Sequence, residues 1–320
     1  MINRIKEFCK LFKGDIRYLF TLYRYDMMLF KKYSCMNNTN PEVIATRIRL
    51  LAHALEKGMS LPNPRAGFGK EKILSLIELC KEYNSIPRTK DSQAVDIAKG
   101  VISSYLKFQD ALGVDVTFIP EEVREECTRT IVKGGTIHIV REELTTNFAD
   151  IAHKRHSLRF FSTNPVSKAD IENAVSLAQT APSACNRQPI NIYACTKPGC
   201  IDAILKLHGG MRGFGKPTVI FAITGDLTLY QNEYERNTVF VDGGLFGMNL
   251  LYALDSCGIA SCPIIWGCNP SDDIQMSKIL GIPENHKICI LVAAGYFPSA
   301  EYDVAASVRR TTNDILHIIE

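Results

Sequence analysis

Apolar residues recur every three to four positions through much of the first half of the chain. The apolar positions of the first such run lie on one helical face: Ile44, Ile48, Leu51 and Leu55. Pro41 precedes this run and Gly58 follows it, and these residue types favour the first turn and the end of a helix. The same periodicity predicts three further helices, over residues 70–83, 91–113 and 120–132. Residues 1–148 are therefore expected to form a mainly helical region.

The pattern changes beyond about residue 148, where helical stretches alternate with short, continuous apolar runs. Three runs have the length and composition of buried strands: INIYA at 190–194, PTVIFAITG at 217–225 and KICILVAAG at 287–295. Three helices are expected around them: from a Ser167 cap to about Thr180, from Val239 to Ser256, and from a Ser271 cap to Gly281. This alternation predicts a layered α/β domain over residues 149–320.

The overall composition is that of a globular protein. With 46% hydrophobic and 22% charged residues, the chain has enough apolar side chains to bury a core, and its 320 residues favour two domains. A net charge of only +3 gives no electrostatic footprint for nucleic acid. The eleven cysteines include no C-x-x-C pair, so we expect no metal site and cysteines that remain thiols in a reducing compartment.

The first 33 residues carry most of the positive charge, with eight Lys or Arg against three acidic residues, a net +5. They lack the apolar core and cleavage site of a secretory signal, so we expect a cytoplasmic protein. One helical face of this segment is apolar, through Ile5, Phe8, Phe12 and Ile16. A basic amphipathic helix of this kind can contact an anionic membrane surface. We favour the alternative, in which this face packs on the helical region or on a partner subunit.

A second basic cluster begins the α/β domain. The segment HKRHSLRFFS, residues 153–162, places Lys154, Arg155, His156 and Arg159 close together. A guanidinium binds phosphate through two parallel hydrogen bonds, and hydroxyl groups and backbone amides add further donors. The cluster therefore fits a phosphate group. From the residues of this segment alone, a solvated basic helix face remains an equal alternative.

Three further segments follow this cluster along the chain: TAPSACNRQPIN at 180–191, ASCPIIWG at 260–267 and SVRRTTNDILHII at 307–319. Together with RHSLR, the helix VDGGLFGMNLLYALDSCGIA and the segment GIPENHKICILVAAGYF, their order resembles that of the FMN-dependent nitroreductase family over about residues 150–320. The resemblance implies an α+β fold, a three-layer α/β/α sandwich with a central, mostly antiparallel sheet. The mainly helical region 1–148 lies outside the common core of that family.

The resemblance also implies which residues bind FMN. The phosphate side would be formed by Arg155, His156 and Ser157. Arg309 matches a terminal arginine that reaches the same phosphate, with Arg310 as a one-residue alternative. Arg159 matches the position at the pyrimidine edge of the isoalloxazine ring, where a fixed guanidinium stabilises the anionic reduced flavin.

Two turns complete the implied flavin site. One faces the ring near its reactive N5 atom and comprises Cys262, Pro263 and Ile264. Whether the Ser261 hydroxyl, the Cys262 thiol or a backbone amide contacts N5 is left open by the sequence. In the interlocked homodimers of the family, the other turn approaches FMN from the second subunit, through Pro182, Ser183, Asn186 and Gln188. Cys185 in that turn is interpreted as a small packing residue rather than a reactive thiol.

The function implied by the resemblance is electron transfer from NAD(P)H to a small electron-poor acceptor, such as a nitroaromatic, a quinone or a biosynthetic intermediate, in a ping-pong cycle. The flavin supplies the chemistry, so no catalytic acid–base pair is expected. Two alternatives remain: specialised flavin chemistry, such as dehalogenation, flavin fragmentation or substrate oxidation, and a non-catalytic binding or scaffold module. The glycine-rich loop 209–215 and the aromatic residues Tyr230, Tyr234 and Phe240 are candidates for the substrate side.

Overall fold

The computed structural model describes residues 20–21, 23–24, 27–28, 41–87, 92–129, 134–140, 147–230 and 233–320. The chain divides into two compact units. One contains residues 1–24 and 141–300, and the other contains residues 25–140 and 301–320. The amphipathic pattern predicted for residues 1–33 falls almost entirely outside the described residues. Among the described helices, none combines the length and apolar character needed to cross a membrane.

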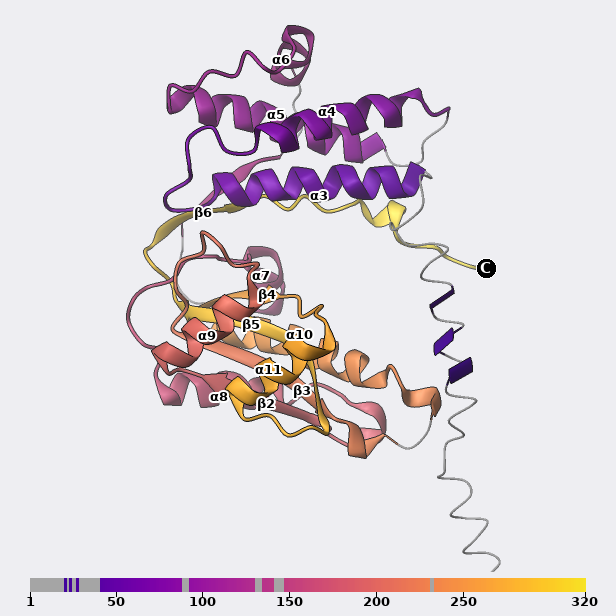
Figure 1. Cartoon of the computed structure of the whole chain (residues 1–320), viewed down its shortest axis with the longest axis vertical. Coiled ribbons are helices and arrows are strands. Elements are labelled where there is room, and N and C mark those ends of the chain that lie inside the picture. Colours follow the sequence, from indigo (N-terminus) through magenta and orange to yellow (C-terminus); the bar gives the residue numbers. More distant parts are fainter. Residues whose placement is uncertain are drawn as a thin grey trace, which may run out of the picture. The chain divides into compact units, whose positions relative to one another are not determined.

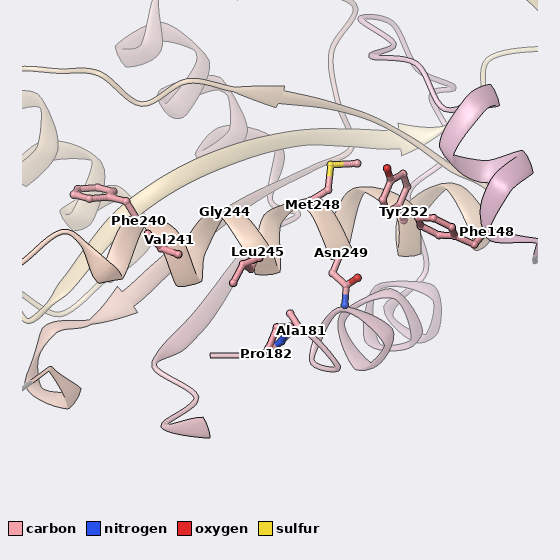
Figure 2. A pocket seen from close by; sticks show the side chains of 10 residues that line it. All are labelled: Phe148, Ala181, Pro182, Phe240, Val241, Gly244, Leu245, Met248, Asn249 and Tyr252. Atoms are coloured by element: carbon pink, nitrogen blue, oxygen red, sulfur yellow. The ribbon is translucent and has the colours of Figure 1, made fainter. Parts of the chain in front are cut away.

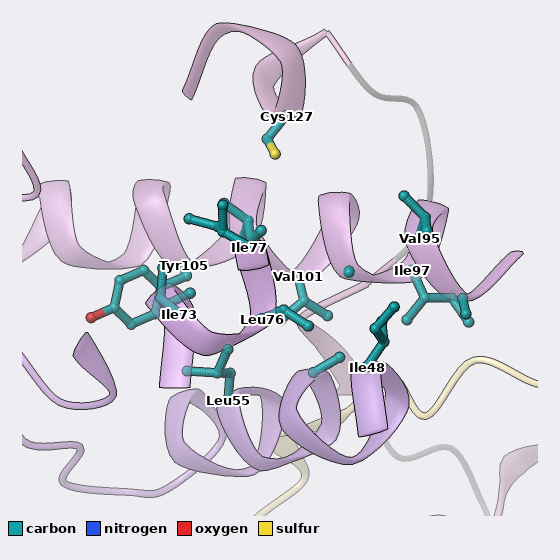
Figure 3. Packing of buried hydrophobic residues seen from close by; sticks show 14 of the residues in the cluster. Ile48, Leu55, Ile73, Leu76, Ile77, Val95, Ile97, Val101, Tyr105 and Cys127 are labelled. Carbon is teal, nitrogen blue, oxygen red and sulfur yellow. The ribbon is translucent and has the colours of Figure 1, made fainter. Parts of the chain in front are cut away.

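The second unit is built on the helices α3 (Pro41–Met59), α4 (Lys70–Ser85), α5 (Ser92–Ala111) and α6 (Glu121–Thr128) (Figure 1). Their apolar faces meet in one core, to which the predicted positions Ile48 and Leu55 contribute fully buried side chains. Figure 3 shows these two residues of α3 facing side chains of α4 and α5, including Tyr105. The helical periodicity of the sequence is thus confirmed for all four helices.

A two-stranded antiparallel ribbon belongs to the same unit. It pairs β1 (Thr136–Val140) with β6 (Glu301–Ala305). Farther along the chain, Val308 packs against the helical core. The sequence predicted that all of 149–320 forms one domain, whereas residues 301–320 group with the helices. The two strands are short and far apart in sequence, so neither contains a signal that identifies its partner.

The first unit contains a four-stranded antiparallel sheet in the order β2-β3-β5-β4. Its strands are β2 (Ile190–Cys195), β3 (Val219–Asp226), β4 (Ile259–Ile264) and β5 (His286–Tyr296). β3 is central and is buried along nearly its whole length, as its continuous apolar sequence predicted. β4 lies at an edge of the sheet, a position in which proline is tolerated because one side of the strand needs no ladder donor.

Five helices surround this sheet: α7 (Phe148–Lys154), α8 (Lys168–Ala178), α9 (Pro198–His208), α10 (Thr238–Ser256) and α11 (Pro270–Leu280). α8 and α10 share a core with alternate residues of β3, among them Phe221 and Ile223. The intervening residues of β3 are also buried, so the opposite face is covered as well, and α9 and α11 pack against each other. The predicted α+β class, antiparallel sheet and helical N-terminal region are confirmed.

Two local predictions need correction. The segment SCPII was expected to form a turn, but its first four residues lie in β4, paired with β5 from Ser261↔Ala294 to Ile264↔Leu291. The proline suggested a turn because the edge position of the strand could not be seen in the sequence. The cap of α11 is Asn269, whose side chain accepts a hydrogen bond from the amide of Asp272, rather than Ser271.

Candidate functional site

The basic segment after α7 runs beside the edge strand β4. Arg155 caps the helix, with its amide bonded to the carbonyl oxygen of Ile151 at 2.9 Å. Ser157 then forms a parallel bridge with Ser261, and the amide of Leu158 donates to the Ser261 carbonyl oxygen at 3.1 Å. Two segments that the sequence assigned separately to a flavin site, RHSLR and SCPII, are therefore neighbours in the structure.

Arg159 is the buried cation of this segment, with an exposed fraction of 7%. Its Nη1 donates to the carbonyl oxygen of Ser157 at 3.3 Å, and its guanidinium lies 5.7 Å from the centroid of the Phe214 ring. The amide of Gly215 donates to the Arg159 carbonyl oxygen at 2.8 Å. Through these contacts the glycine-rich loop 209–215 packs against the basic segment. The loop is thus the third segment of the candidate site, after RHSLR and SCPII.

Gly215 is required by this close approach. A Cβ atom at this position would lie 2.8 Å from the Cα of Phe160, which is shorter than real side chains allow. A larger residue would therefore have to push the loop away from the Phe160 backbone. The loop and the segment that carries Arg159 are consequently fixed against each other.

The half-buried residues Arg155, His156 and Ser157 provide the cationic and hydroxyl groups of the site. His156 Nδ1 lies 2.7 Å from the carbonyl oxygen of Lys154. Because a carbonyl can only accept, this contact assigns the ring proton to Nδ1 and leaves Nε2 available to a ligand when the imidazole is neutral. The Arg155 guanidinium and the Ser157 hydroxyl are donors that fit a phosphate, and the His156 imidazole adds a donor at Nε2 only in its protonated form.

The end of β4 connects to the glycine-rich loop through His208, a residue that the sequence interpretation missed. His208 Nδ1 accepts from the amide of Gly210 at 3.2 Å, so Nε2 carries the proton and donates to the Ile265 carbonyl oxygen at 3.0 Å. The imidazole stacks on Trp266, with 6.1 Å between ring centroids. Ile265 itself is 84% exposed and lies directly after the strand that contains Cys262.

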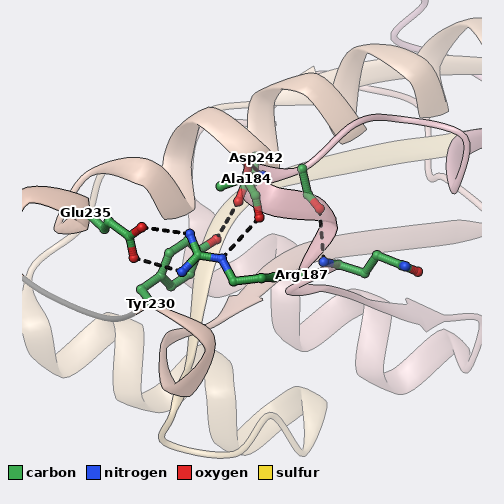
Figure 4. Close-up of polar contacts among 7 residues, drawn as sticks. Ala184, Arg187, Tyr230, Glu235 and Asp242 are labelled. Atoms are coloured by element: carbon green, nitrogen blue, oxygen red, sulfur yellow. Dashed lines mark hydrogen bonds and ion pairs between the residues drawn. The ribbon is translucent and has the colours of Figure 1, made fainter. Parts of the chain in front are cut away.

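The turn over residues 182–188 has a strained backbone. Cys185 and Gln188 both have φ of 51°, in the left-handed region that non-glycine residues seldom adopt. The amide of Gln188 donates to Ser183 Oγ at 2.9 Å. The side chain of Asn186 lies outside what the structure describes. Among the described residues, the hydrogen bonds that leave this turn run to Asp242 of α10 and to Glu235 (Figure 4).

An apolar cavity of about 510 Å³ opens on the outer side of α10 (Figure 2). Its lining includes Pro182 of the turn and the exposed α10 residues Val241, Leu245 and Met248. Phe148 and Tyr252 close one end, with their rings edge to face at 5.4 Å. This lining contains no cation, so it suits an apolar partner rather than a phosphate.

The predicted phosphate ligands Arg309 and Arg310 belong to the unit that contains the helical core. Arg309 is fixed within that unit, since its carbonyl oxygen accepts from Gln93 Nε2 at 3.1 Å and its Nη1 donates to the Ser307 carbonyl oxygen at 3.1 Å. Their part in the flavin site remains a prediction. No group of metal-ligating side chains occurs in the part of the chain that the structure describes.

Comparison with known proteins points to one family. Residues 152–208 match the model of the Nitroreductase family. A candidate NADH dehydrogenase/NAD(P)H nitroreductase of Archaeoglobus fulgidus is 29% identical over 170 residues, which cover 52% of this chain and 93% of that protein. Iodotyrosine deiodinase 1 of Rattus norvegicus is 25% identical over 207 residues, which cover 53% of this chain and 68% of that protein.

One solved structure that is similar to this chain is a candidate nitroreductase in complex with FMN from Exiguobacterium sibiricum. It has a TM-score of 0.47 and 21% identity, over 55% of this chain and 99% of that chain. The family model covers the basic segment and the turn 182–188, two of the segments on which the resemblance in the sequence rests. The C-terminal half of this chain therefore contains a match to the Nitroreductase family model, and the similarity to the Archaeoglobus fulgidus protein extends over 52% of the chain.

Proposed function

We propose that this protein is an FMN-dependent oxidoreductase that transfers electrons from NAD(P)H to a small electron-poor acceptor. The observation that carries the proposal is the pairing of the basic segment with β4, because it joins Ser157 and Leu158, the residues just before Arg159, to Ser261. A buried guanidinium next to an edge strand can bind the anionic edge of a flavin whose ring lies along that strand. The family domain and the NAD(P)H nitroreductase relative support the same reaction class.

The residues of the site have two roles in this proposal. Arg155, His156 and Ser157 bind the phosphate, while Arg159 stabilises negative charge on the ring after reduction. Bound FMN supplies the two-electron carrier that NAD(P)H reduces and the acceptor reoxidises. The low exposure of Arg159 strengthens its electrostatic effect, because fewer water molecules screen it. Ile265 and the loop 209–215 border the place where the two substrates would enter in turn.

The proposal includes a homodimer. The outer face of α10 exposes apolar side chains around the cavity that Pro182 also lines. A contiguous apolar face of this kind is typical of a subunit interface. Since Pro182 belongs to the turn 182–188, a second copy bound at this face would lie next to that turn. The turn could then contribute Ser183 and Gln188 to the flavin site of the partner subunit.

A second candidate reaction is reductive dehalogenation of an aromatic substrate. It is favoured by the similarity to iodotyrosine deiodinase 1. The two reactions differ in their acceptor and in how electrons leave the flavin. Ser261, which is almost fully buried in β4, has a hydroxyl group that could serve one-electron transfer.

The absorbance spectrum of the purified full-length chain tests the proposal. We expect a flavin band, FMN released on denaturation, and loss of the band when NADH or NADPH is added without oxygen. Nitroaromatic, quinone and iodotyrosine acceptors, added in turn to the reduced protein, then distinguish the two reactions. A colourless protein that does not bind added FMN would refute both and leave the scaffold alternative.

A further inference from the structure

A buried polar cluster joins the turn 182–188 to α10 and to the segment that precedes it. Its members are Ala184 and Arg187 of the turn, Tyr230 and Glu235 before the helix, and Asp242 within it. Figure 4 shows the Arg187 guanidinium between the Glu235 carboxylate and the turn, with the Tyr230 ring beside it. None of these residues is explained by a direct role in the flavin site described above.

Asp242 anchors the turn from inside the fold. Its carboxylate is only 3% exposed, and Oδ1 accepts from the amide of Ala184 at 3.1 Å. Oδ2 accepts from the Tyr230 hydroxyl at 3.0 Å. Burial and the neighbouring Asp242 raise the pKa of Tyr230, so the phenol remains protonated and able to donate. A buried carboxylate is stable only when hydrogen-bond donors replace water at its oxygens. The Ala184 amide and the Tyr230 hydroxyl provide one donor for each oxygen of Asp242.

Arg187 holds the same turn from its other side. Its Nε donates to the Ala184 carbonyl oxygen at 3.1 Å. Its two terminal nitrogens donate to the two carboxylate oxygens of Glu235 at 2.9 and 2.8 Å, and its guanidinium lies 5.5 Å from the Tyr230 ring centroid. The peptide groups of Ala184 are thus fixed at the amide by one charged residue and at the carbonyl by another.

This double anchoring accounts for the strained backbone of the turn. A non-glycine residue in the left-handed region is stable only where its surroundings enforce that conformation. Cys185, with φ of 51°, directly follows the residue that Asp242 and Arg187 fix. The amide of Gln188, at the second strained position, is bonded to Ser183 Oγ on the far side of the same turn.

We infer that Asp242 and Arg187 are positioning residues that hold the turn 183–188 in its ligand-binding conformation, so that Ser183 and Gln188 can bind FMN. This inference rests on the proposed function. Glu235 and Tyr230 share the cluster, so the segment before α10 and the flavin turn are placed together. That segment contains Tyr230 and Tyr234, which the sequence suggests for the substrate side, so loss of its anchor should affect acceptor binding as well as FMN affinity.

Hydrogen exchange followed by mass spectrometry tests the anchoring without any cofactor. In Asp242→Asn and Arg187→Lys, we expect the exchange rate of the segment 183–188 to rise about tenfold, while the β3 segment 219–225 remains protected. Arg187→Lys keeps the charge and removes the bidentate geometry, so it is the milder variant if Asp242→Asn unfolds. Glu172→Gln, at an exposed ion pair of α8, is the matched control and should change neither segment.

Titration of the same variants with FMN tests the positioning role. We expect the dissociation constant for FMN to rise about tenfold in each variant. This factor corresponds to the loss of one hydrogen bond to a charged group. Glu235→Gln should raise the acceptor KM severalfold with kcat nearly unchanged, a division that general destabilisation would not produce.

Unchanged exchange in both variants would overturn the anchoring, and increased exchange with unchanged FMN affinity would overturn the positioning role. A wild-type chain that binds no FMN would instead refute the proposed function, and the exchange data would still decide whether the cluster holds the turn.

Discussion

The amide of Leu158 and the carbonyl oxygen of Ser261 form a hydrogen bond of 3.1 Å between segments far apart in the sequence. This bond fixes the backbone of the basic segment, immediately before Arg159, against β4. A flavin site at this place therefore depends on a backbone contact as well as on the side chains that would bind the cofactor.

The phosphate side of the site is tested by Arg155→Ala. We expect FMN binding to weaken by about 1.5–3 kcal/mol, the range for a hydrogen bond to a charged group. Isothermal titration of the flavin-free protein with FMN measures the change. Lys168→Ala removes an exposed cation from α8 and should leave the affinity unaltered. Full affinity in a folded Arg155→Ala protein would show that the phosphate binds elsewhere.

The contact between Gly215 and Phe160 predicts a local effect of an added methyl group. Gly215→Ala should destabilise the fold by about 1–3 kcal/mol, as expected for overpacking, because the new Cβ meets backbone rather than a flexible side chain. It should also lower FMN affinity, since the loop bonds to the Arg159 carbonyl. Gly199→Ala meets nothing within 4 Å and is the control. Equal urea midpoints for the two variants would contradict the prediction.

The β1–β6 ribbon contains a pH-sensitive contact. His138 Nδ1 lies 2.9 Å from Asp303 Oδ1 across the ribbon, and Asp303, with Glu301, raises the pKa of His138 above its ordinary value. A raised pKa in the folded state means that protonation stabilises the fold. That contribution is present at pH values below 6.5 and is lost as the pH rises through the folded-state pKa.

We therefore expect the wild-type protein to have a higher urea midpoint of unfolding than His138→Gln at pH 5.5. The difference between the two midpoints should be smaller at pH 8. Comparing the two proteins at each pH cancels the titration of all other groups. The effect should be small, because the imidazole is exposed and its pairing is screened by solvent. A difference that is the same at both pH values would mean that the charge on His138 does not contribute.

The apolar face of α10 predicts a specific assembly. Leu245→Glu places a charge in the lining of the cavity and should convert a dimer into monomers, as measured by analytical ultracentrifugation. An obligate interface of this kind buries roughly 2,000 Å² or more. Leu74→Glu changes an exposed leucine of the helical unit and should have no effect on assembly. A wild-type protein that sediments as a monomer would refute the proposed homodimer.

Local patterns in the sequence were sufficient for much of the fold. The spacing of Ile44, Ile48 and Leu55 predicted α3, and the continuous apolar run predicted β3, because both signals are contained within one element. β4 was interpreted as a turn because of Pro263, and its edge position emerges only from its pairing with β5. The short helices α7 and α9 were missed, since a helix of about two or three turns contains too few residues to show a clear period.

For the candidate site too, the sequence identified individual segments but not the contacts between them. The residues of RHSLR and SCPII could be named from the sequence, but their contact at Ser157 and Ser261 could not, because it depends on the complete sheet. Arg187 lies within the motif APSACNRQP, yet only the structure pairs it with Glu235. Ion pairs of this type form only when the fold brings two distant residues together. The distance between Arg187 and Glu235 along the sequence does not indicate that they are in contact.

The pairing of β1 with β6 has a consequence for how the chain is synthesised. Residues 141–300, which belong to the other unit, lie between the two strands of the ribbon in the sequence. During translation, β1 therefore cannot pair with β6 until all of residues 141–300 have been synthesised. The usual order, in which the N-terminal domain finishes folding first, does not apply to this ribbon. A nascent chain that ends at residue 300 would contain all four strands of the larger sheet, while the helical unit still lacked its last strand.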